Sequence, residues 1–376
     1  MARIALISDN PGDLTKSRSY IIKAFLDRGD EVYALSCDYT EEQMDQLRDL
    51  GAKPVAYSLQ RSGLNPLHDI KSIYGLIKIL KKLNPDITFS YGNKPVIYGL
   101  IASRMIKVPK RYSLVTGLGV IYSEIGYNTK RNKLTRILMN TLYRVSLRHG
   151  DKIFFQNPDD IELFERKKLL KKGQALLVNG TGVDLNIYNT VADQKDPITF
   201  TMATRLLKSK GVYEYIEAAR RIRSKFKDQD IRFNLLGRPH ESNPDTVPRI
   251  QLEEWQKEGI IVWPGSVSNV KDWLEKSSVF VFPSLYREGT PRCVLEAMAM
   301  SLPIVTTDMP GCRETVKIGV NGFLVKPQDV DSLTEAMEQF ILDPKLISEM
   351  GKESRRISVE KYDIHKVNNY MLSVIK

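Results

Sequence analysis

Short apolar runs alternate with amphipathic segments along this chain, and the alternation starts twice. In the first half, strand-like runs lie at residues 3–8, 31–36, 86–91, 111–116, 152–156 and 175–180, and helix-like segments lie at 19–29, 69–83, 96–106 and 133–150. Strands that alternate with helices in this way predict a parallel sheet with helices on both faces. The first half is therefore expected to form one α/β domain.

The same alternation resumes after a polar stretch. Strand-like runs lie at 198–204, 231–237, 259–265, 279–284 and 302–308, and helix-like segments lie at 212–226, 270–277 and 290–301. A chain of 376 residues is longer than a single hydrophobic core usually grows. We therefore expect two parallel-sheet domains, 1–188 and 198–359, joined by a linker at 189–197, with a helical segment 360–376 that packs back on the first domain.

One strand-to-helix loop of the second half carries two cations. Arg205 and Lys210 follow the strand-like run 198–204, and Gly211 stands just before the next helix. Loop amides, a helix N-terminus and two positive charges suit a diphosphate, whereas a solvated basic loop explains the same residues about equally well. The pattern is neither a Walker loop nor a dinucleotide fingerprint. Ligands of parallel sheets bind beyond the carboxyl ends of the strands, so this loop is a candidate binding site.

The stretch YREGTPRCVLEAMAM at 286–300 follows another strand-like run in the same way. Thr290 suits an N-cap, so a helix is expected to begin there and to leave Glu288 and Gly289 in the loop. Glu288 would then lie at the end of the strand, either bound to a ligand or solvated.

Glu296 lies inside that predicted helix, among apolar neighbours. A buried carboxylate needs hydrogen-bond donors. Sugar hydroxyls of a ligand would supply them, and so would an arginine such as Arg292, so both explanations stay open.

Taken together, these motifs resemble the retaining, GT-B-fold glycosyltransferases of the large family four. Arg205 and Lys210 form its R-x4-K motif, Glu288 and Glu296 form its E-x7-E motif, and residues 310–333 are similar to the segment that follows. The resemblance implies a GT-B fold, in which two Rossmann-like domains face each other across a cleft. It also implies that Arg205 and Lys210 bind a donor diphosphate, that Glu288, Gly289 and Thr290 lie at the donor sugar, and that Glu296 binds the ribose.

The first half contains Asn65-Pro66, Lys94-Pro95 and Thr116-Gly117-Leu118-Gly119. With these residues it resembles the subgroup that acts on undecaprenyl-diphosphate-linked sugars in O-antigen, capsule and protein-glycan assembly, whose best-known members transfer N-acetylgalactosamine in α-1,3 linkage. This implies a UDP-sugar donor and a polyprenyl-diphosphate-linked sugar acceptor, with contacts to the acceptor or sugar at Asn93, Lys94, Thr116 and Gly117. Asn93 stands where many members have a histidine. It either bonds a sugar hydroxyl or shapes the turn before the helix.

Gly12, which follows the first strand-like run, would let a ligand approach the backbone closely or would simply form a turn. No histidine lies at metal-ligand spacing, and Asp329 and Asp331 precede a helix, where N-capping explains them. We therefore expect neither a metal ion nor a cofactor besides the UDP-sugar co-substrate.

The net charge of +11 is concentrated in one part of the chain. Residues 51–150 contain 17 lysines and arginines against 3 acids, a local excess of +14. The helix-like segments 69–83 and 133–150 each have an apolar stripe, which is expected to pack on the sheet and to leave the basic residues outside. The stripes consist of Ile70, Ile73, Leu76, Ile77, Leu80 and Leu83, and of Leu134, Ile137, Leu138, Leu142 and Val145. Such a face attracts nucleic acid, an anionic substrate or an anionic membrane, and a lipid-linked acceptor favours the membrane.

The sequence contains no apolar run of 18 residues and no basic-then-apolar N-terminus, and its three cysteines form no C-x-x-C pair. We therefore expect a cytoplasmic enzyme that associates peripherally with the inner face of the plasma membrane. Two alternatives remain. One is a sugar-nucleotide 2-epimerase, which has the same architecture. The other is a nucleic-acid-binding protein, against which the lack of an aromatic reading motif counts.

Overall fold

The computed structural model describes residues 1–60, 66–123, 130–190, 196–240 and 243–376. The chain divides into two compact units. Unit 1 comprises Met1–Ile121, Thr129–Gly182 and Ile364–Lys376, and unit 2 comprises Tyr122–Asn128 and Val183–Asp363. The division thus falls at Gly182, a few residues before the predicted boundary, and part of the predicted linker lies outside the described residues.

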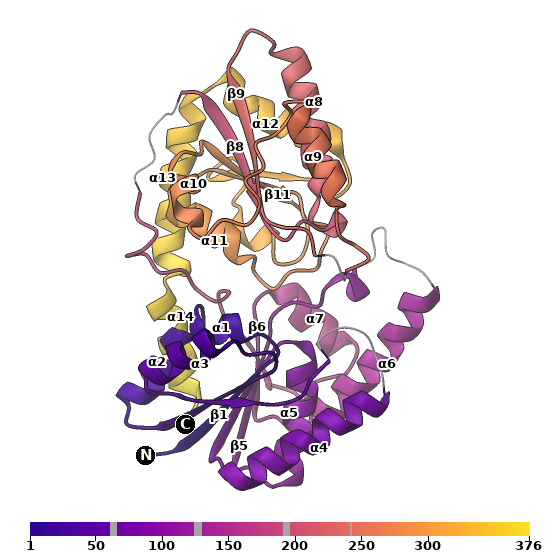
Figure 1. Ribbon diagram of the computed structural model, residues 1–376, viewed down its shortest axis with the longest axis vertical. Helices are drawn as coiled ribbons and strands as arrows, with labels where there is room; N and C mark the ends of the chain where they lie inside the picture. Colours follow the sequence, from indigo (N-terminus) through magenta and orange to yellow (C-terminus); the bar gives the residue numbers. More distant parts are fainter. Residues whose placement is uncertain (61–65, 124–129, 191–195, 241–242) are drawn as a thin grey trace. The chain divides into compact units, whose positions relative to one another are not determined.

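Unit 1 contains a seven-stranded sheet in the order β3-β2-β1-β4-β5-β6-β7, in which the strands pair in parallel. Its strands are β1 (Arg3–Ser8), β2 (Glu31–Ser36), β3 (Lys53–Ala56), β4 (Ile87–Tyr91), β5 (Lys110–Val115), β6 (Lys152–Phe155) and β7 (Ala175–Leu177). Its helices are α1 (Pro11–Thr15), α2 (Ser19–Asp27), α3 (Glu41–Asp49), α4 (Pro66–Leu83), α5 (Asn93–Met105), α6 (Lys130–Leu147), α7 (Pro158–Arg166) and α14 (Ile364–Val374). Figure 1 shows helices along both faces of this sheet.

The C-terminal helix α14 packs into unit 1, as the sequence predicts. Val367, Met371 and Ile375 are buried in the core formed by β1, β4 and α2. His365 meets the ring of Tyr20 edge to face at 5.8 Å between centroids. The chain therefore ends in the unit in which it begins, although the part that joins unit 1 starts at Ile364 rather than at 360.

Unit 2 contains a five-stranded parallel sheet in the order β12-β11-β10-β8-β9. Its strands are β8 (Ile198–Ala203), β9 (Ile231–Leu236), β10 (Val279–Phe282), β11 (Ile304–Thr307) and β12 (Gly322–Val325). Its helices are α8 (Val212–Lys225), α9 (Arg249–Lys257), α10 (Val270–Glu275), α11 (Arg292–Ala299), α12 (Val330–Leu342) and α13 (Lys345–Lys361). Both predicted domains are thus parallel-sheet units.

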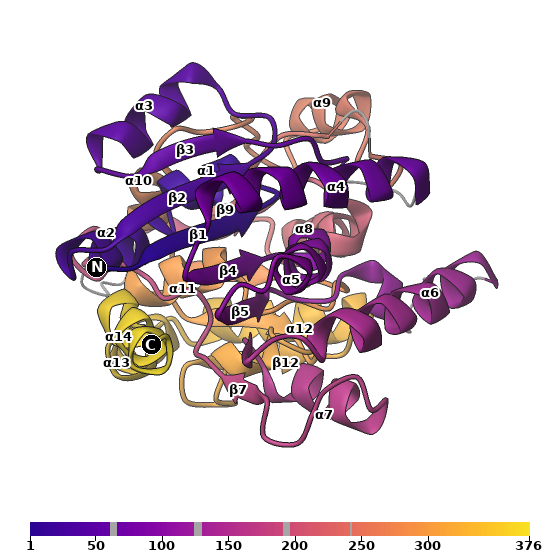
Figure 2. The ribbon, with the colours of Figure 1, turned by 90° about the horizontal axis from the view of Figure 1, so that it is seen from below.

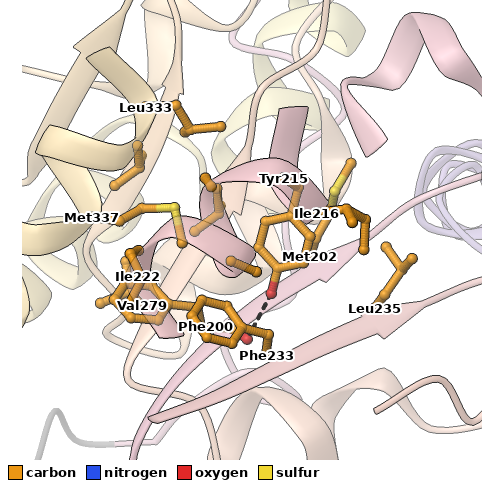
Figure 3. Packing of buried hydrophobic residues seen from close by; sticks show 14 of the residues in the cluster. Phe200, Met202, Tyr215, Ile216, Ile222, Phe233, Leu235, Val279, Leu333 and Met337 are labelled. Atoms are coloured by element: carbon orange, nitrogen blue, oxygen red, sulfur yellow. Dashed lines mark hydrogen bonds between the residues drawn. The ribbon is translucent and has the colours of Figure 1, made fainter. Parts of the chain in front are cut away.

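Tyr215 of α8 joins the helix layer of unit 2 to its sheet. Its ring is fully buried, and its hydroxyl donates to the carbonyl oxygen of Phe200 at 2.9 Å (Figure 3). The rings of Phe200 and Phe233 stack below it, 5.5 Å apart. This core holds β8 and β9 in place, and the loop that carries Arg205 and Lys210 follows β8 directly.

One predicted strand is wrong. Residues 259–265 form no strand, and Val262 makes only an isolated bridge to Asn234. Gly259 and Gly265 flank the segment with φ of +73° and +79°, in the left-handed region that ends an extended run. Conversely, β3, α1, α3, α7 and α9 are absent from the prediction, and each of them has nine residues or fewer.

The prediction for the basic helices is also wrong in part. Leu76 and Leu80 of α4 are buried, but Leu67, Ile70 and Tyr74 are between 58% and 79% exposed. In α6 the exposed apolar residues are Leu134, Ile137, Leu138 and Val145, at 43% to 70%, whereas Met139, Tyr143 and Leu147 are buried. Figure 2 shows α5 between α4 and α6, and both helices contact it. Contact with α5 therefore determines which face of α4 and of α6 is buried, and each of these helices keeps apolar side chains exposed to solvent.

Candidate active site

Two predicted site residues meet at the carboxyl ends of β8 and β10 in unit 2. Lys210 is the last residue of the short 3-10 helix Lys208–Lys210, and its ammonium group forms an ion pair with the Glu288 carboxylate. The Ser284 hydroxyl donates to the same carboxylate oxygen at 2.9 Å. The ammonium also lies 4.1 Å from the centre of the Tyr286 ring, a cation–π arrangement. Both side chains are largely buried, so their charges act in a medium that screens them weakly.

Glycines allow the loops at this site to approach one another. Gly211 has φ of +79°, and a Cβ there would lie 2.0 Å from the carbonyl oxygen of Pro283. Gly311 has φ of +82°, and a Cβ there would lie 2.2 Å from the carbonyl oxygen of Gly289 and 2.6 Å from that of Glu288. Only glycine fits these two positions without displacement. The segment after β11 that contains Gly311 therefore packs against the backbone of the Glu288 loop.

A cavity of about 310 Å³ lies in unit 2 and is lined by two further predicted donor residues. Arg205 and Glu296 line it together with Arg238, Ser266 and Cys293. Glu296 is 9% exposed and accepts a hydrogen bond from the Nε of Arg292 at 2.8 Å. Of the two explanations that the sequence left open for Glu296, the arginine pair is thus present, and the carboxylate still lines the cavity.

Cys293 lines the cavity without being suited to act as a nucleophile. Burial, reinforced by the nearby Glu296 and Glu288 carboxylates, raises the pKa of its thiol well above the ordinary value. Burial likewise raises the pKa of Cys312 to about 12. A thiol in this state stays protonated near neutral pH, and the thiolate is the reactive form.

The start of α11 differs by one residue from the prediction. Pro291, not Thr290, occupies the N-cap position, and the helix runs from Arg292 to Ala299. The proline ring fixes φ near the value required there, and its side chain caps nothing. Gly289 and Thr290 are buried in the loop between Glu288 and this helix.

Two of the first-half residues predicted to contact a sugar have partners within unit 1. Asn93 begins α5, and its side-chain oxygen accepts a hydrogen bond from the Tyr143 hydroxyl at 2.9 Å. Lys94 is buried, and its ammonium donates to the Gln60 carbonyl oxygen at 2.8 Å and to the Asp69 carboxylate at 2.9 Å. Lys94 thus ties α5 to α4. These contacts favour structural roles, and sugar contacts at both residues stay predictions.

Three further predicted positions lie near strand ends of unit 1. Thr116 and Gly117 follow β5, and Gly117 has φ of +110°. Gly12 lies in the first turn of α1, where its N–H donates to the Asn10 side-chain oxygen at 3.2 Å. That contact is the N-cap hydrogen bond of α1, so Gly12 lies in a helix rather than in a plain turn, and a close approach of a ligand there stays a prediction.

In the parts of the chain that the structure describes, no group of three or more histidine, cysteine or acidic residues is arranged to hold a metal ion. Asp329 caps α12, since its side chain accepts from the Ser332 N–H at 2.9 Å. Over the same described ranges, no helix is long and apolar enough to cross a bilayer.

Comparisons with known proteins give this geometry its context. A family model described as "Glycosyl transferases group 1" matches residues 187–357, and one described as "Glycosyl transferase 4-like" matches residues 3–157. The N,N'-diacetylbacillosaminyl-diphospho-undecaprenol alpha-1,3-N-acetylgalactosaminyltransferase of Campylobacter jejuni is 30% identical over 96% of this chain and 95% of its own length. The chain belongs to the glycosyltransferases. The predicted family and transferase activity are thereby confirmed.

A second relative of this glycosyltransferase is the UDP-Gal:alpha-D-GlcNAc-diphosphoundecaprenol alpha-1,3-galactosyltransferase of Escherichia coli, 27% identical over 80% of this chain and 77% of its own length. Among solved structures, HepE of Anabaena in complex with UDP and glucose superposes with a TM-score of 0.77 at 16% sequence identity. The superposition covers 100% of this chain and 99% of the HepE chain. Sucrose-phosphate synthase of Thermosynechococcus elongatus superposes with a TM-score of 0.81 at 18% identity, covering 100% and 98%. These likenesses confirm the GT-B fold class.

Sequence reasoning assigned no role to several residues that line the site. Arg238 and Ser266 lie on the cavity wall, and Tyr286 lies against the Lys210 ammonium. Arg238 directly follows β9 and its glycine, the same position after a strand that singled out Arg205. Its position after a strand could therefore have identified Arg238 from the sequence. The contact of Tyr286 with the Lys210 ammonium depends on how the loops fold and has no such sequence signal.

Proposed function

We propose that this glycosyltransferase transfers a hexose or N-acetylhexosamine, with N-acetylgalactosamine as the first candidate, from a UDP-sugar to a polyprenyl-diphosphate-linked sugar. Such a reaction serves O-antigen, capsule or protein-glycan assembly. The observation that carries the proposal is the 30% identity, over nearly the whole of both chains, to an enzyme named for an undecaprenol-linked acceptor. Both relatives described above are named as transferases, which favours transfer over epimerisation.

The donor would lie at the carboxyl ends of the unit 2 strands. Arg205 and Lys210 would neutralise the diphosphate as it leaves, which is where negative charge grows in the transition state. Glu288 would accept hydrogen bonds from the donor sugar's hydroxyls, beside the backbone of Gly289 and Thr290. Glu296, held by Arg292, would accept hydrogen bonds from the ribose in the 310 Å³ cavity.

The proposed reaction retains the anomeric configuration by front-face substitution. The bond between the sugar C1 and the diphosphate oxygen breaks, and the acceptor oxygen bonds to C1 on the same face. The acceptor's proton passes to the leaving phosphate oxygen. The cations Arg205 and Lys210 supply the charge that a metal ion supplies in other transferases, so we propose that no metal is required.

The test of this function is a donor screen. A panel of nucleotide sugars is incubated with a short synthetic polyprenyl-diphosphate sugar, with and without a chelator, and products are detected by mass. We expect one UDP-sugar to add a single sugar residue in α linkage by NMR, at a rate that the chelator leaves within about twofold. An isomerised nucleotide in the absence of acceptor would instead identify an epimerase, and a tenfold loss with chelator would refute metal independence.

Glu296→Ala is expected to raise the KM for the UDP-sugar by roughly 10- to 100-fold with little change in kcat, because hydrogen bonds to a charged group contribute about 1.5–3 kcal/mol. Initial rates at varied donor concentration measure this. The matched control is Glu353→Ala, which removes a glutamate from an exposed ion pair with Arg356 on α13. A Glu296→Ala protein that fails to fold, while the control folds, would show that the carboxylate is structural.

We also propose that α4 and α6 bring unit 1 to an anionic membrane surface. Their exposed apolar residues are interspersed with exposed basic residues: Lys71, Lys78, Lys82, Lys133 and Arg144. The exposed Arg148 follows α6 directly. A basic residue near anionic lipid contributes about 1 kcal/mol, and apolar side chains add burial. This arrangement is typical of helices that lie on a bilayer.

The triple variant Lys71→Gln/Lys78→Gln/Lys82→Gln should weaken binding to vesicles containing phosphatidylglycerol by roughly 100-fold at low salt, at about 1 kcal/mol per charge. Vesicle flotation measures it. The matched control removes three exposed lysines of unit 2: Lys227, Lys257 and Lys352. Equal binding of the wild type to neutral vesicles would contradict the electrostatic proposal, and binding to RNA of similar strength would favour the nucleic-acid alternative.

A further inference from the structure

A second pocket of unit 2 lies between three of its helices. It has a volume of about 290 Å³ and is lined by residues of α8, by Trp255 of α9, and by Gln328 and Val330 at the start of α12. We call it the Glu214 pocket, after a glutamate of α8 in its wall. None of the residues that line it also lines the donor cavity.

An aromatic pair forms one wall of the Glu214 pocket. The ring of Tyr213 on α8 meets the ring of Trp255 on α9 edge to face, with 5.4 Å between their centroids. Trp255 is 3% exposed, whereas Tyr213 is 36% exposed, so Tyr213 is the ring that a ligand can reach. Ile216 and Val330 add apolar surface to the lining.

The charged residues of the lining leave one carboxylate without a counter-charge. Arg220 donates to the Glu258 carboxylate at 2.7 Å, and Glu217 accepts a hydrogen bond from the Nε of Arg221 at 3.1 Å. Glu214, in contrast, forms no ion pair with any residue that the structure describes. The pocket therefore has one uncompensated negative charge.

The position of Glu214 makes that charge available to a ligand. Its side chain is half-buried in the first turn of α8, where burial raises the pKa of the carboxyl and its own backbone N–H offsets part of the shift. A partly desolvated carboxylate attracts a cation more strongly than one in water does.

The rest of unit 2 does not repel a cation from this pocket. Residues 183–363 contain 25 lysines and arginines against 27 acids, so the positive net charge of the chain lies outside this stretch. An anionic ligand would instead meet the Glu214 carboxylate. The charge thus favours a cationic ligand, and the apolar and aromatic walls favour an organic cation over a metal ion.

We propose that the Glu214 pocket binds an alkylammonium group, with the Glu214 carboxylate as its counter-charge and the Tyr213 ring as its cation–π partner. The methylene groups of the ligand would pack on Ile216 and Val330. Ligand pockets usually measure roughly 300–1,000 Å³, so a volume of about 290 Å³ suits a short amine chain rather than a nucleotide sugar. Polyamines and the lysine side chains of proteins both carry such a group.

The test titrates spermidine into the protein at physiological ionic strength and follows binding by calorimetry. We expect the wild type to bind spermidine at one saturable site and Glu214→Gln to weaken it on the order of 10- to 100-fold, the loss of a charge-assisted hydrogen bond. Tyr213→Leu should weaken binding by roughly 2- to 30-fold, through loss of the cation–π attraction. The matched control is Glu349→Gln, which removes an exposed glutamate of α13 and should leave affinity within twofold.

A second titration, with Nα-acetyl-lysine methylamide, distinguishes the two sources of the group. Tighter binding of spermidine would support the proposal with a polyamine as ligand, and tighter binding of the lysine derivative would support it with a lysine of a partner protein. Equal affinity of Glu214→Gln and the wild type for both probes would overturn the proposal, and so would displacement of spermidine by an equal concentration of Mg²⁺. Thermal unfolding checks that the variants fold, and Glu214→Gln alone decides the outcome if Tyr213→Leu does not. Because binding rather than transfer is measured, the result is independent of the proposed function.

Discussion

Lys210→Met and Glu288→Gln are each expected to lower kcat for sugar transfer by roughly 100- to 1,000-fold, the usual effect of removing one preorganised group that acts on transition-state charge. Lys210→Met should also destabilise the fold by about 3–5 kcal/mol, because the largely buried Glu288 carboxylate loses its counter-charge. The loss of rate and the loss of stability therefore have different causes and need separate measurement.

The double variant Lys210→Met/Glu288→Gln separates them. Since both charges are removed together, the free energy of unfolding should return to within about 1–2 kcal/mol of the wild type, while transfer stays lost. Denaturant unfolding and initial rates measure the two quantities. Lys225→Met/Glu338→Gln removes a Lys–Glu pair between α8 and α12, in which the glutamate is similarly buried but the lysine is exposed, and should leave transfer intact. Recovery of transfer in the double variant at Lys210 and Glu288 would show that the pair only holds the loops.

Gly311→Ala should lower both stability and transfer, although residue 311 itself would touch no substrate. The new Cβ would lie 2.2 Å from the Gly289 carbonyl oxygen at a φ of +82°. A left-handed conformation costs an L-residue about 1–2 kcal/mol, and relieving the overlap must move the loop that carries Glu288. We expect a total loss of about 2–4 kcal/mol in the free energy of unfolding.

Gly319→Ala is the matched control, because Gly319 has a φ of +72° and a Cβ there would meet nothing within 4 Å. It should show only the conformational cost, and its kcat should be unchanged. Thermal unfolding and initial rates of both variants give the comparison. If the two variants lost equal stability and both kept their rates, the close contact at Gly311 would not position the loop.

Parts of the fold could be read from the sequence with good accuracy. The core strands β1 and β10 contain uninterrupted apolar runs, at 4–7 and 279–282, because strands buried on both faces need no alternation. The strands β4 and β8 have buried threonine or serine residues among their apolar ones. The edge strand β3 has no buried side chain, with Lys53 and Ala56 exposed and Pro54 and Val55 half-buried, and was missed for that reason. Conversely, residues 259–265 have the composition of a strand but pair at a single position. Composition does not report whether a neighbouring strand is available.

Helix α6 shows that the sequence is also limited in predicting which side chains of a helix are buried. Its apolar residues recur at helical spacing along two faces, and the face through Leu134 and Ile137 was the one predicted to be buried. The structure buries the face through Met139 and Tyr143 instead, because that face meets α5. Periodicity establishes that a helix forms, but the choice between two apolar faces depends on what packs against it.

The sequence by itself determined which residues stand at the ends of strands: Arg205 and Lys210 after β8, and Glu288 after β10. That followed from local pattern, since the end of an apolar run and the start of a helix are short-range signals. Only the tertiary structure decided that Lys210 and Glu288, 78 positions apart, form an ion pair, and that Glu296 pairs with Arg292 on the wall of a cavity. The tertiary structure also decided that Ser123 donates a hydrogen bond to Leu285 in the loop after β10, and that Lys94 pairs with Asp69. Partners distant in sequence meet because parallel strands bring their carboxyl ends to one edge of a sheet, and no local pattern encodes which loops then touch.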